Sequence, residues 1–355
     1  MEQLSVRALN RALLARQMLL KRESTTADRV IEHLGGLQAQ QARPPFTGLW
    51  SRIEAFDAED LLKLLRARKI LRATAVRGTL HLITPADFQA WRPLLQPMLS
   101  AGAQSILRER LTTFDHQSVL HCATECFSRG PRTFTALRNE LIHAFPDSDE
   151  RAMGYFVRMN LPLAAVPDDR APWGFGPDAE FETIPNVTGD RQLAGYMQAL
   201  ITRYLGAFGP ASVADFQAWS GLKGAKPLFE GMSLLTFHDT RKRVLYDLPD
   251  GPRPDPETPA PIRFIAEFDN LILGHADRSR ILSDEYRPRV VTKNLLVLGT
   301  FLVDGFVAGT WKYDTKKKGP PVRLELFDQL APRVMKALEE EGARLARFIA
   351  PHDTE

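Results

Sequence analysis

The spacing of apolar residues predicts two regions of different structure. Up to about residue 250, leucine, valine and phenylalanine recur every three or four positions, as on the buried face of a helix. Beyond residue 261 apolar and polar residues alternate as in strands, and Asp304-Gly305 separates two such runs as a two-residue hairpin turn does. An amphipathic helix over 331–348 closes the chain. We therefore expect an α+β protein that is mainly helical.

The first helical region has the pattern of a winged helix-turn-helix. Helices are predicted over 5–21, 25–34 and 58–68 from the spacing of their leucines and from capping residues such as Asp57. Two short strands within 70–83 meet at a glycine turn. Three helices followed by such a hairpin, or wing, form this motif.

Two later regions repeat the same order of elements and would form a second and a third unit. The third unit is predicted to begin with a helix from Asp190. Each has a Gly-Pro break after its first helix. The breaks align without a gap, 130–137 against 209–216. Both place a Ser or Thr cap two residues after the proline and an apolar residue four positions further on. We expect three tandem winged helix-turn-helix units.

These patterns divide the chain into five parts. Six prolines between residues 249 and 261 predict an extended linker. The expected parts are 1–114 for the first winged-helix unit with the long helix after it, 115–187 for the second unit, 188–250 for the third, 251–261 for the linker, and 262–355 for a C-terminal β-rich domain with its closing helix.

Composition narrows the setting of the protein. Hydrophobic residues make up 44% of the 355 residues, as in ordinary globular proteins. The chain has no run of 18 apolar residues, and its N-terminus lacks the pattern of a signal peptide, so we expect no membrane partner and a location in the bacterial cytoplasm or on its nucleoid. Cys122 and Cys126 suit one helix face, and packing is favoured over a zinc site with His121 or His116 because CxxC spacing is absent. We expect a monomer with neither metal nor other cofactor.

The net charge of +3 is compatible with binding to nucleic acid, and the basic residues are clustered. The clusters consist of Arg66, Arg68, Lys69, Arg72, Arg77 and His81 around the first wing; Arg278, Arg280, Arg287, Arg289 and Lys293, diluted by three acids; and Lys316 to Lys318. Each cluster alone is also what a solvated surface contains. Together, beside winged helices, they favour a track for DNA phosphates.

The candidate chemistry lies in the stretch 35–45, which reads Gly-Gly-Leu-Gln-Ala-Gln-Gln-Ala-Arg-Pro-Pro. Pro44 and Pro45 forbid a continuing helix, so we expect a helix end or a loop. Gln38 and Gln40 would point the same way from an extended or turn-like backbone. Two amides that face one spot can hold a water molecule, a sugar or a base edge, but neither is a strong base. The alternative is a loop with two solvated amides.

Four segments resemble the AlkZ/YcaQ family of winged-helix DNA glycosylases. They are Gly36 to Gln40, Arg77 to Leu82, Phe268 to Ile281 and Val307 to Trp311, in family order over nearly the whole chain. The resemblance implies three tandem winged helices followed by a β domain. It also implies removal of N7-alkylated guanines, bulky adducts included; some members unhook interstrand crosslinks. Gln38 and Gln40 match the Gln-aliphatic-Gln pattern of the AlkZ-like branch, whereas the YcaQ-like branch has Gln-x-Asp.

The resemblance therefore implies a monofunctional DNA glycosylase that acts on alkylated guanine in double-stranded DNA, for repair or for self-resistance to a DNA-alkylating antibiotic. N7 alkylation lets guanine leave as a neutral base, so amides that position water near C1′ can suffice. Gln38 and Gln40 would be catalytic. The DNA-binding residues would be Arg72, Arg77, Thr79, His81, His275, Arg278, Arg280, Lys316, Lys317 and Lys318.

Alternatives remain open for the function and for single residues. A transcriptional regulator without catalysis fits winged helices, although three units and no heptad run argue against it. His81 and His275 are as well explained by bonds within their own domain as by contact with DNA. Arg278, Arg280 and Asp277 would equally form an ion-paired loop that holds the β domain on the helices.

Overall fold

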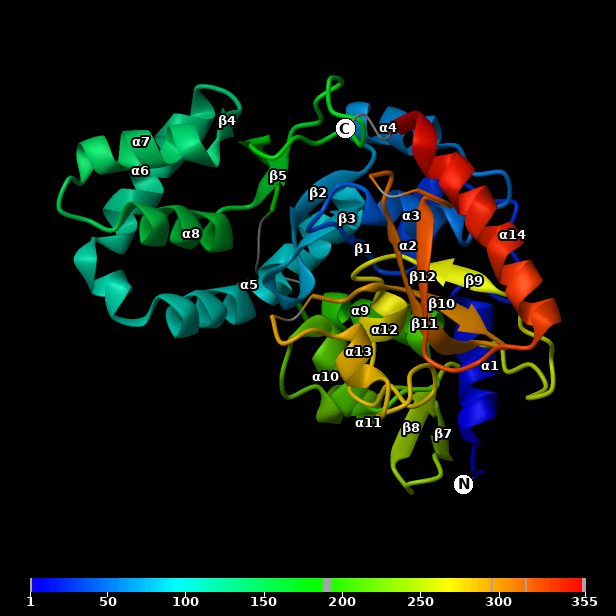
Figure 1. Cartoon of the computed structure of the whole chain (residues 1–355). Helices are drawn as coiled ribbons and strands as arrows, with labels where there is room; N and C mark the ends of the chain where they lie inside the picture. Colours follow the sequence, from blue (N-terminus) through cyan, green and yellow to red (C-terminus); the bar gives the residue numbers. More distant parts are fainter. Residues whose placement is uncertain (1, 188–192, 295, 317, 353–355) are drawn as a thin grey trace.

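The computed structural model describes residues 2–187, 193–294, 296–316 and 318–352. Helices and strands are mixed, as predicted, and Figure 1 shows a lobe at the left that is joined to the larger body through the long helix α5 (Pro85–Leu107). Among the described helices none is long and apolar enough to cross a membrane. The predicted helix start at Asp190, and Lys317, lie outside the described residues.

One order of elements occurs three times: a helix, a short strand, two helices and an antiparallel hairpin. The first module consists of α2 (Ala27–His33), β1 (Leu37–Gln38), α3 (Pro44–Trp50), α4 (Ala58–Arg66), β2 (Leu71–Thr74) and β3 (Leu80–Ile83). The second consists of α6 (His116–Ser128), β4 (Arg132–Thr133), α7 (Phe134–Ala144), α8 (Glu150–Asn160), β5 (Leu163–Ala165) and β6 (Glu180–Thr183). The third consists of α9 (Leu193–Phe208), a bridge between Ala211 and Tyr246, α10 (Val213–Ser220), α11 (Lys226–Gly231), β7 (Leu235–His238) and β8 (Val244–Asp247). The domain boundaries given above stay predictions.

The first module differs from its predicted form in two respects. The helix expected over 5–21 is α1 (Val6–Arg16), which precedes the module and packs on α9 of the third module. The short helix α3, which begins at Pro44, was not predicted; the prolines were expected only to prevent the helix over 25–34 from continuing, and that helix ends at His33. Proline blocks the continuation of a helix, but at the first helical position it has no N–H to lose and its φ is already suitable.

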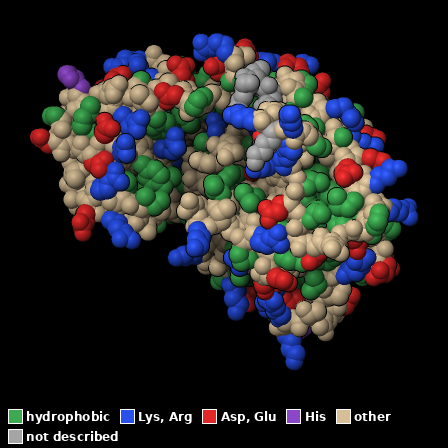
Figure 2. Space-filling view, viewed as in Figure 1, with side chains coloured by type: hydrophobic (Ala, Val, Ile, Leu, Met, Phe, Trp, Pro, Cys, Tyr) green, Lys and Arg blue, Asp and Glu red, His purple; other side chains and the backbone are tan. Residues whose placement is uncertain are grey.

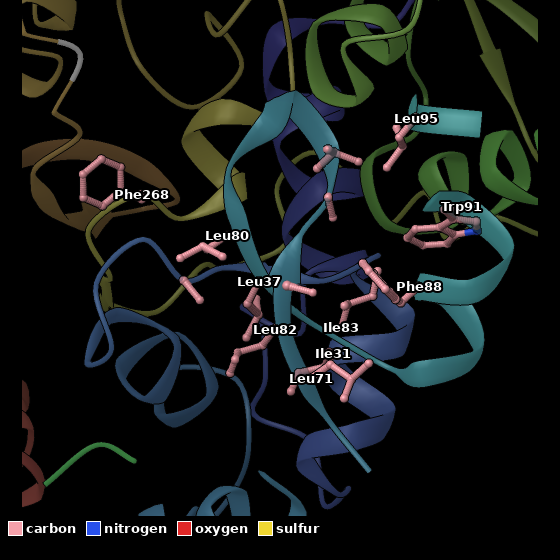
Figure 3. Packing of buried hydrophobic residues seen from close by; sticks show 14 of the residues in the cluster. Ile31, Leu37, Leu71, Leu80, Leu82, Ile83, Phe88, Trp91, Leu95 and Phe268 are labelled. Atoms are coloured by element: carbon pink, nitrogen blue, oxygen red, sulfur yellow. The ribbon is translucent and has the colours of Figure 1, made fainter. Parts of the chain in front are cut away.

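A six-stranded sheet joins the first two modules, in the order β1-β3-β2-β5-β6-β4. Its central junction is the antiparallel pairing of β2 with β5, where Arg72 lies opposite Ala165. Figure 3 shows Leu82 and Ile83 of β3 in one apolar core with Phe88 of α5. Main-chain hydrogen bonds therefore cross the boundary predicted between residues 114 and 115.

The C-terminal region is built on a four-stranded antiparallel sheet, as its alternating pattern predicts. The strands are β9 (Arg263–Ile265), β10 (Gly299–Val303), β11 (Phe306–Tyr313) and β12 (Val322–Leu326), in the order β12-β11-β10-β9. The turn at Asp304-Gly305 is confirmed, with φ of 47° and 83° at its two residues. The closing helix α14 (Pro332–Ile349) covers the sheet (Figure 1). Its Leu338 and Leu345 belong to one buried apolar cluster with Phe264 and Trp311. The short helices of this region are α12 (Asn270–Leu273), α13 (Arg287–Val290) and η3 (Ala350–His352). Two further short helices lie earlier in the chain, η1 (Val76–Gly78) and η2 (Arg108–Thr113).

Two buried ion pairs tie the modules and the C-terminal region together. Arg16 of α1 bonds both carboxylate oxygens of Asp247 on β8, at 2.7 and 2.9 Å. Arg52, just after α3, bonds both oxygens of Asp269 before α12, at 2.8 and 2.9 Å. Removing one partner of such a pair leaves an uncompensated buried charge and costs about 3–5 kcal/mol. The first pair holds α1 on the third module, and the second holds α12 against the first module, next to the glutamine stretch.

Candidate functional site

Gln38 is the interior member of the glutamine pair and has only 9% of its surface exposed. Its side-chain Oε1 accepts a hydrogen bond from Nη2 of Arg77 at 2.9 Å. The same nitrogen donates to Oδ1 of Asn270 at 2.9 Å, and Nη1 of Arg77 donates to the carbonyl of Trp219 at 2.7 Å. Arg77 therefore connects β1 with α10 and α12.

Arg77 also determines which atom of the Gln38 amide faces it. A guanidinium only donates, so its partner must be the amide oxygen and not the NH2 group. Burial lowers the pKa of Arg77 to about 10, with the nearby charge of Arg278 as the second cause. The group stays protonated at neutral pH. Gln38 is thus held by a charged donor, which fixes the orientation of its amide.

Gln40 has the opposite environment, because its side chain is exposed. Its Oε1 accepts from the main-chain N–H of Leu80 at 3.3 Å. The main chain beside it is fixed by Arg72, whose Nε and Nη2 donate to the carbonyls of Ala39 and Gln40 at 2.9 and 3.1 Å. Gln38 has the extended backbone that was predicted and Gln40 lies in a bend, but the prediction of a helix end or loop is wrong for Gln38, because Leu37 and Gln38 form a strand paired with β3.

A cleft of about 330 Å³ opens beside Gln40, between the first and second modules. Gln40, Gln41 and Arg72 line one side, and Arg158 of α8 and the loop between β5 and β6 line the other. Figure 2 shows that the surface is hollowed between the lobe at the left and the larger body, with Lys and Arg side chains on both sides of the hollow. The two amides are thus not equivalent: Gln40 faces the cleft, whereas Gln38 belongs to the interior.

Three predicted DNA-binding residues are buried and bonded within the protein. Nδ1 of His81 donates to the carbonyl of Thr79 at 3.0 Å, and Nε2 of His275 donates to the carbonyl of Phe208 at 2.9 Å. Burial is the main cause that lowers the pKa of each histidine to about 3. Nη1 of Arg280 donates to the carbonyl of Pro210 at 2.7 Å. Direct contact of His81, His275 and Arg280 with DNA is therefore corrected to bonds within the protein, because their side chains have almost no surface to offer.

The loop that contains His275 is ion-paired and holds the C-terminal region on the helices, which is the alternative to contact with DNA. Asp277 forms ion pairs with Arg241 and Arg243 of the hairpin loop in the third module. Nδ2 of Asn10 on α1 donates to the carbonyl of Arg280 at 2.8 Å. The loop thus holds the C-terminal region on the third module and on α1.

The remaining predicted DNA-binding residues differ in exposure. Arg72 is buried, with 7% of its surface exposed, but lines the cleft, and Arg77 is half-buried and bonded as described above. The others have surface available. Arg278 is half-buried, and its Nε and Nη1 have no hydrogen-bond partner among the described residues. Thr79 is half-buried, and its hydroxyl donates to the carbonyl of Val76 at 3.3 Å. Lys316 and Lys318 are exposed. Their contact with DNA stays a prediction.

Sequence patterns missed Arg158, Phe175 and Asn270 as site residues. Asn270 lies inside segment 268–281, one of the four that resemble the family, so the resemblance could have indicated Asn270 as a site residue. Arg158 and Phe175 carry no local signal, since they reach the cleft only through the packing of the second module on the first. In the described part of the chain, no group of three or more His, Cys, Asp and Glu residues is arranged to hold a metal ion.

Comparisons with known proteins agree with this arrangement over almost the whole chain. A family model described as DNA glycosylase AlkZ-like matches residues 31–348. An interstrand DNA cross-link repair glycosylase of Streptomyces sahachiroi is 26% identical over 367 residues, covering 94% of this chain and 93% of that protein. The solved structure of the Streptomyces sahachiroi DNA glycosylase AlkZ is similar with a TM-score of 0.79 at 21% identity, covering 98% of this chain and 97% of that one. That structural likeness shows a shared fold.

Proposed function

The chain belongs to the AlkZ-like family of DNA glycosylases, and we propose that it hydrolyses the N-glycosidic bond of N7-alkylguanines in duplex DNA. Members of this family are hydrolases of N-glycosyl bonds, so a regulator without catalysis is not favoured. One observation carries the proposal: the exposed amide of Gln40 stands on a fixed backbone at a cleft, two residues after the oriented amide of Gln38.

The chemistry of the leaving group suits amides. An N7-alkylguanine is cationic, and when the bond from C1′ to N9 breaks, the electron pair moves to the base and neutralises it. No strong acid is needed. A water oxygen then bonds to C1′ and releases its proton to solvent. The amide oxygen of Gln40 has two lone pairs and uses one within the protein, so one remains to accept from this water and to face the positive charge on the sugar.

The test is base release from a duplex with a single N7-methylguanine, detected by alkaline cleavage of the abasic site. Wild-type protein should cleave with and without EDTA. Gln41→Ala is the matched control, since Gln41 is also an exposed glutamine that lines the cleft. Tight duplex binding without release from simple or bulky N7 adducts would remove the proposed activity.

The likeness to a cross-link repair glycosylase supports an extension of the proposal to crosslinks. We propose that the protein unhooks interstrand crosslinks between two N7 positions, as a monomer in the bacterial cytoplasm, and that it serves repair or self-resistance. A crosslinked duplex should then yield single strands on a denaturing gel. A duplex that stays crosslinked while the single adduct is released would limit the activity to single-strand lesions.

A further inference from the structure

We propose that Arg72 and Arg158 form a phosphate site in the cleft beside Gln40, and that a backbone phosphate of bound DNA occupies it. The inference rests on the proposed function only in taking DNA as the ligand. It concerns a different step, the placing of the strand, and it does not require any particular lesion.

The two arginines approach the cleft from different modules. Arg158 lies on α8 with its guanidinium carbon 4.5 Å from the ring centre of Phe134 and 5.6 Å from that of Phe181. Arg72 lies on β2 with its guanidinium carbon 4.9 Å from the ring centre of Phe175. All of these residues line the cleft together with Gln40. Each guanidinium is therefore supported by an aromatic ring, which restricts the side chain without neutralising its charge.

Neither arginine has an acidic partner among the described residues. Arg72 uses Nε and Nη2 for the carbonyls of Ala39 and Gln40, and the side chain of Arg158 has no hydrogen bond or ion pair within that part of the chain. Asp178 also lines the cleft but forms no ion pair with either of them. The site therefore contains two cations that the protein itself leaves uncompensated.

The two charges also affect each other. Burial lowers the pKa of Arg72 to about 10, and the nearby charge of Arg158 is the second cause. Burial is the first cause that lowers the pKa of Arg158. Both groups stay protonated at neutral pH, so the cleft keeps two like charges in a partly desolvated place. Such an arrangement is unfavourable until an anion enters, and arginine binds phosphate oxygens through its fork of N–H donors.

The same geometry argues against an apolar ligand in this cleft. A guanidinium already lies over each of the rings of Phe134, Phe175 and Phe181, so a base or an aromatic substituent does not find that face of these rings open. What remains toward the cleft is a set of N–H donors. A phosphate held there would bridge β2 and α8 and would fix the strand next to Gln40.

Arg158→Ala is the test variant, because Arg72→Ala would also release the main chain of Gln40. Arg151→Ala is the control: Arg151 lies on the same helix, is exposed and has no ion pair in the described part of the chain. Affinity for an undamaged duplex is measured by fluorescence anisotropy over a range of salt concentrations. Arg158→Ala should bind several-fold more weakly and lower the slope of log K against log[salt] by about 0.9, with the control unchanged. Arg158→Lys should bind with intermediate affinity.

A second measurement identifies the phosphate. Duplexes with one neutral methylphosphonate at each position in turn should include a position that weakens the wild type but not Arg158→Ala. An equal loss for Arg158→Ala and Arg151→Ala would mean unspecific attraction and would overturn the proposal. So would unchanged affinity and slope with slower excision of bulky adducts only, since the cleft would then hold the adduct. Binding to undamaged DNA does not depend on excision, so these results stand apart from the outcome of the glycosylase test.

Discussion

The surroundings of Gln38 and of Gln40 differ although the two residues are separated by one alanine. Gln38 is enclosed by Arg77, Asn270 and the strand pairing with β3, and its amide is oriented by a charged donor. Gln40 is exposed at a cleft, and the nearest arginine holds its main chain and not its amide. One motif thus combines a buried amide whose orientation is fixed and an exposed amide at the edge of a cleft.

The largest effect is expected on the exposed side. Gln40→Ala should lower single-turnover release of N7-methylguanine by roughly 10²–10³, the usual loss for one preorganised polar contact. Duplex affinity and melting temperature should barely change, because the contact matters mainly in the transition state. Wild-type rates for Gln40→Ala would remove the distinction between the two glutamines, and the Gln41→Ala control should excise normally.

The buried side should respond to Arg77→Ala with a smaller loss of rate and a loss of stability. Release should slow by roughly 10–100-fold, as when an outer-shell partner of a metal site is removed. Three acceptors lose their donor, and an unsatisfied buried group costs about 1–3 kcal/mol, so the urea midpoint should fall. The salt dependence of binding should stay as in wild type. A reduced salt slope would mean that Arg77 contacts a phosphate after all.

A third test concerns the hairpin tip at Lys316 to Lys318, two residues of which are described and exposed. Replacing all three lysines with Ser should weaken binding to the duplex. The slope of log K against log[salt] should fall by about 0.9 for each lysine that contacts a phosphate. Stability should change by no more than about 0.5 kcal/mol, since these are surface substitutions. Lys336→Ser, on the exposed side of α14, is the control. Affinity equal to the wild type would make the tip a solvated turn.

The smallest effect appears only in acid. Burial lowers the pKa of His81 to about 3, whereas the unfolded chain titrates near 6.5. Between those values the unfolded state binds the proton and the folded state does not, so stability is lost as pH falls. The slope from one such histidine is at most about 1.4 kcal/mol per pH unit. Urea unfolding at pH 7 and pH 5 should show a smaller difference for His81→Asn than for wild type, and His121→Gln, at an exposed position, should not alter it.

The local features of the fold could be read from the sequence because each depends on a few neighbouring residues. Asp304-Gly305 forms the predicted turn because its backbone needs positive φ, which this dipeptide accepts. The cap at Asp57 is confirmed for the same reason: its side chain accepts from the N–H of Glu59, two residues later. The helix α3 was not predicted, because proline both ends and begins helices and local sequence does not distinguish these two roles.

For the glutamine pair, the sequence identifies the residues but not the surroundings of each amide. The two-residue spacing and the family resemblance identify Gln38 and Gln40, and an extended backbone follows from the pattern. Whether each amide is buried depends on Arg77, Asn270 and the second module, which are distant in the chain and meet the pair only in the folded protein. The same holds for His81, His275 and Arg280: the sequence leaves open whether they contact DNA or the protein, and the fold decides it, because their hydrogen bonds are made to main-chain carbonyls in the interior. Periodicity and turn chemistry act between neighbours, whereas burial of a polar side chain requires a partner that only long-range packing brings to it.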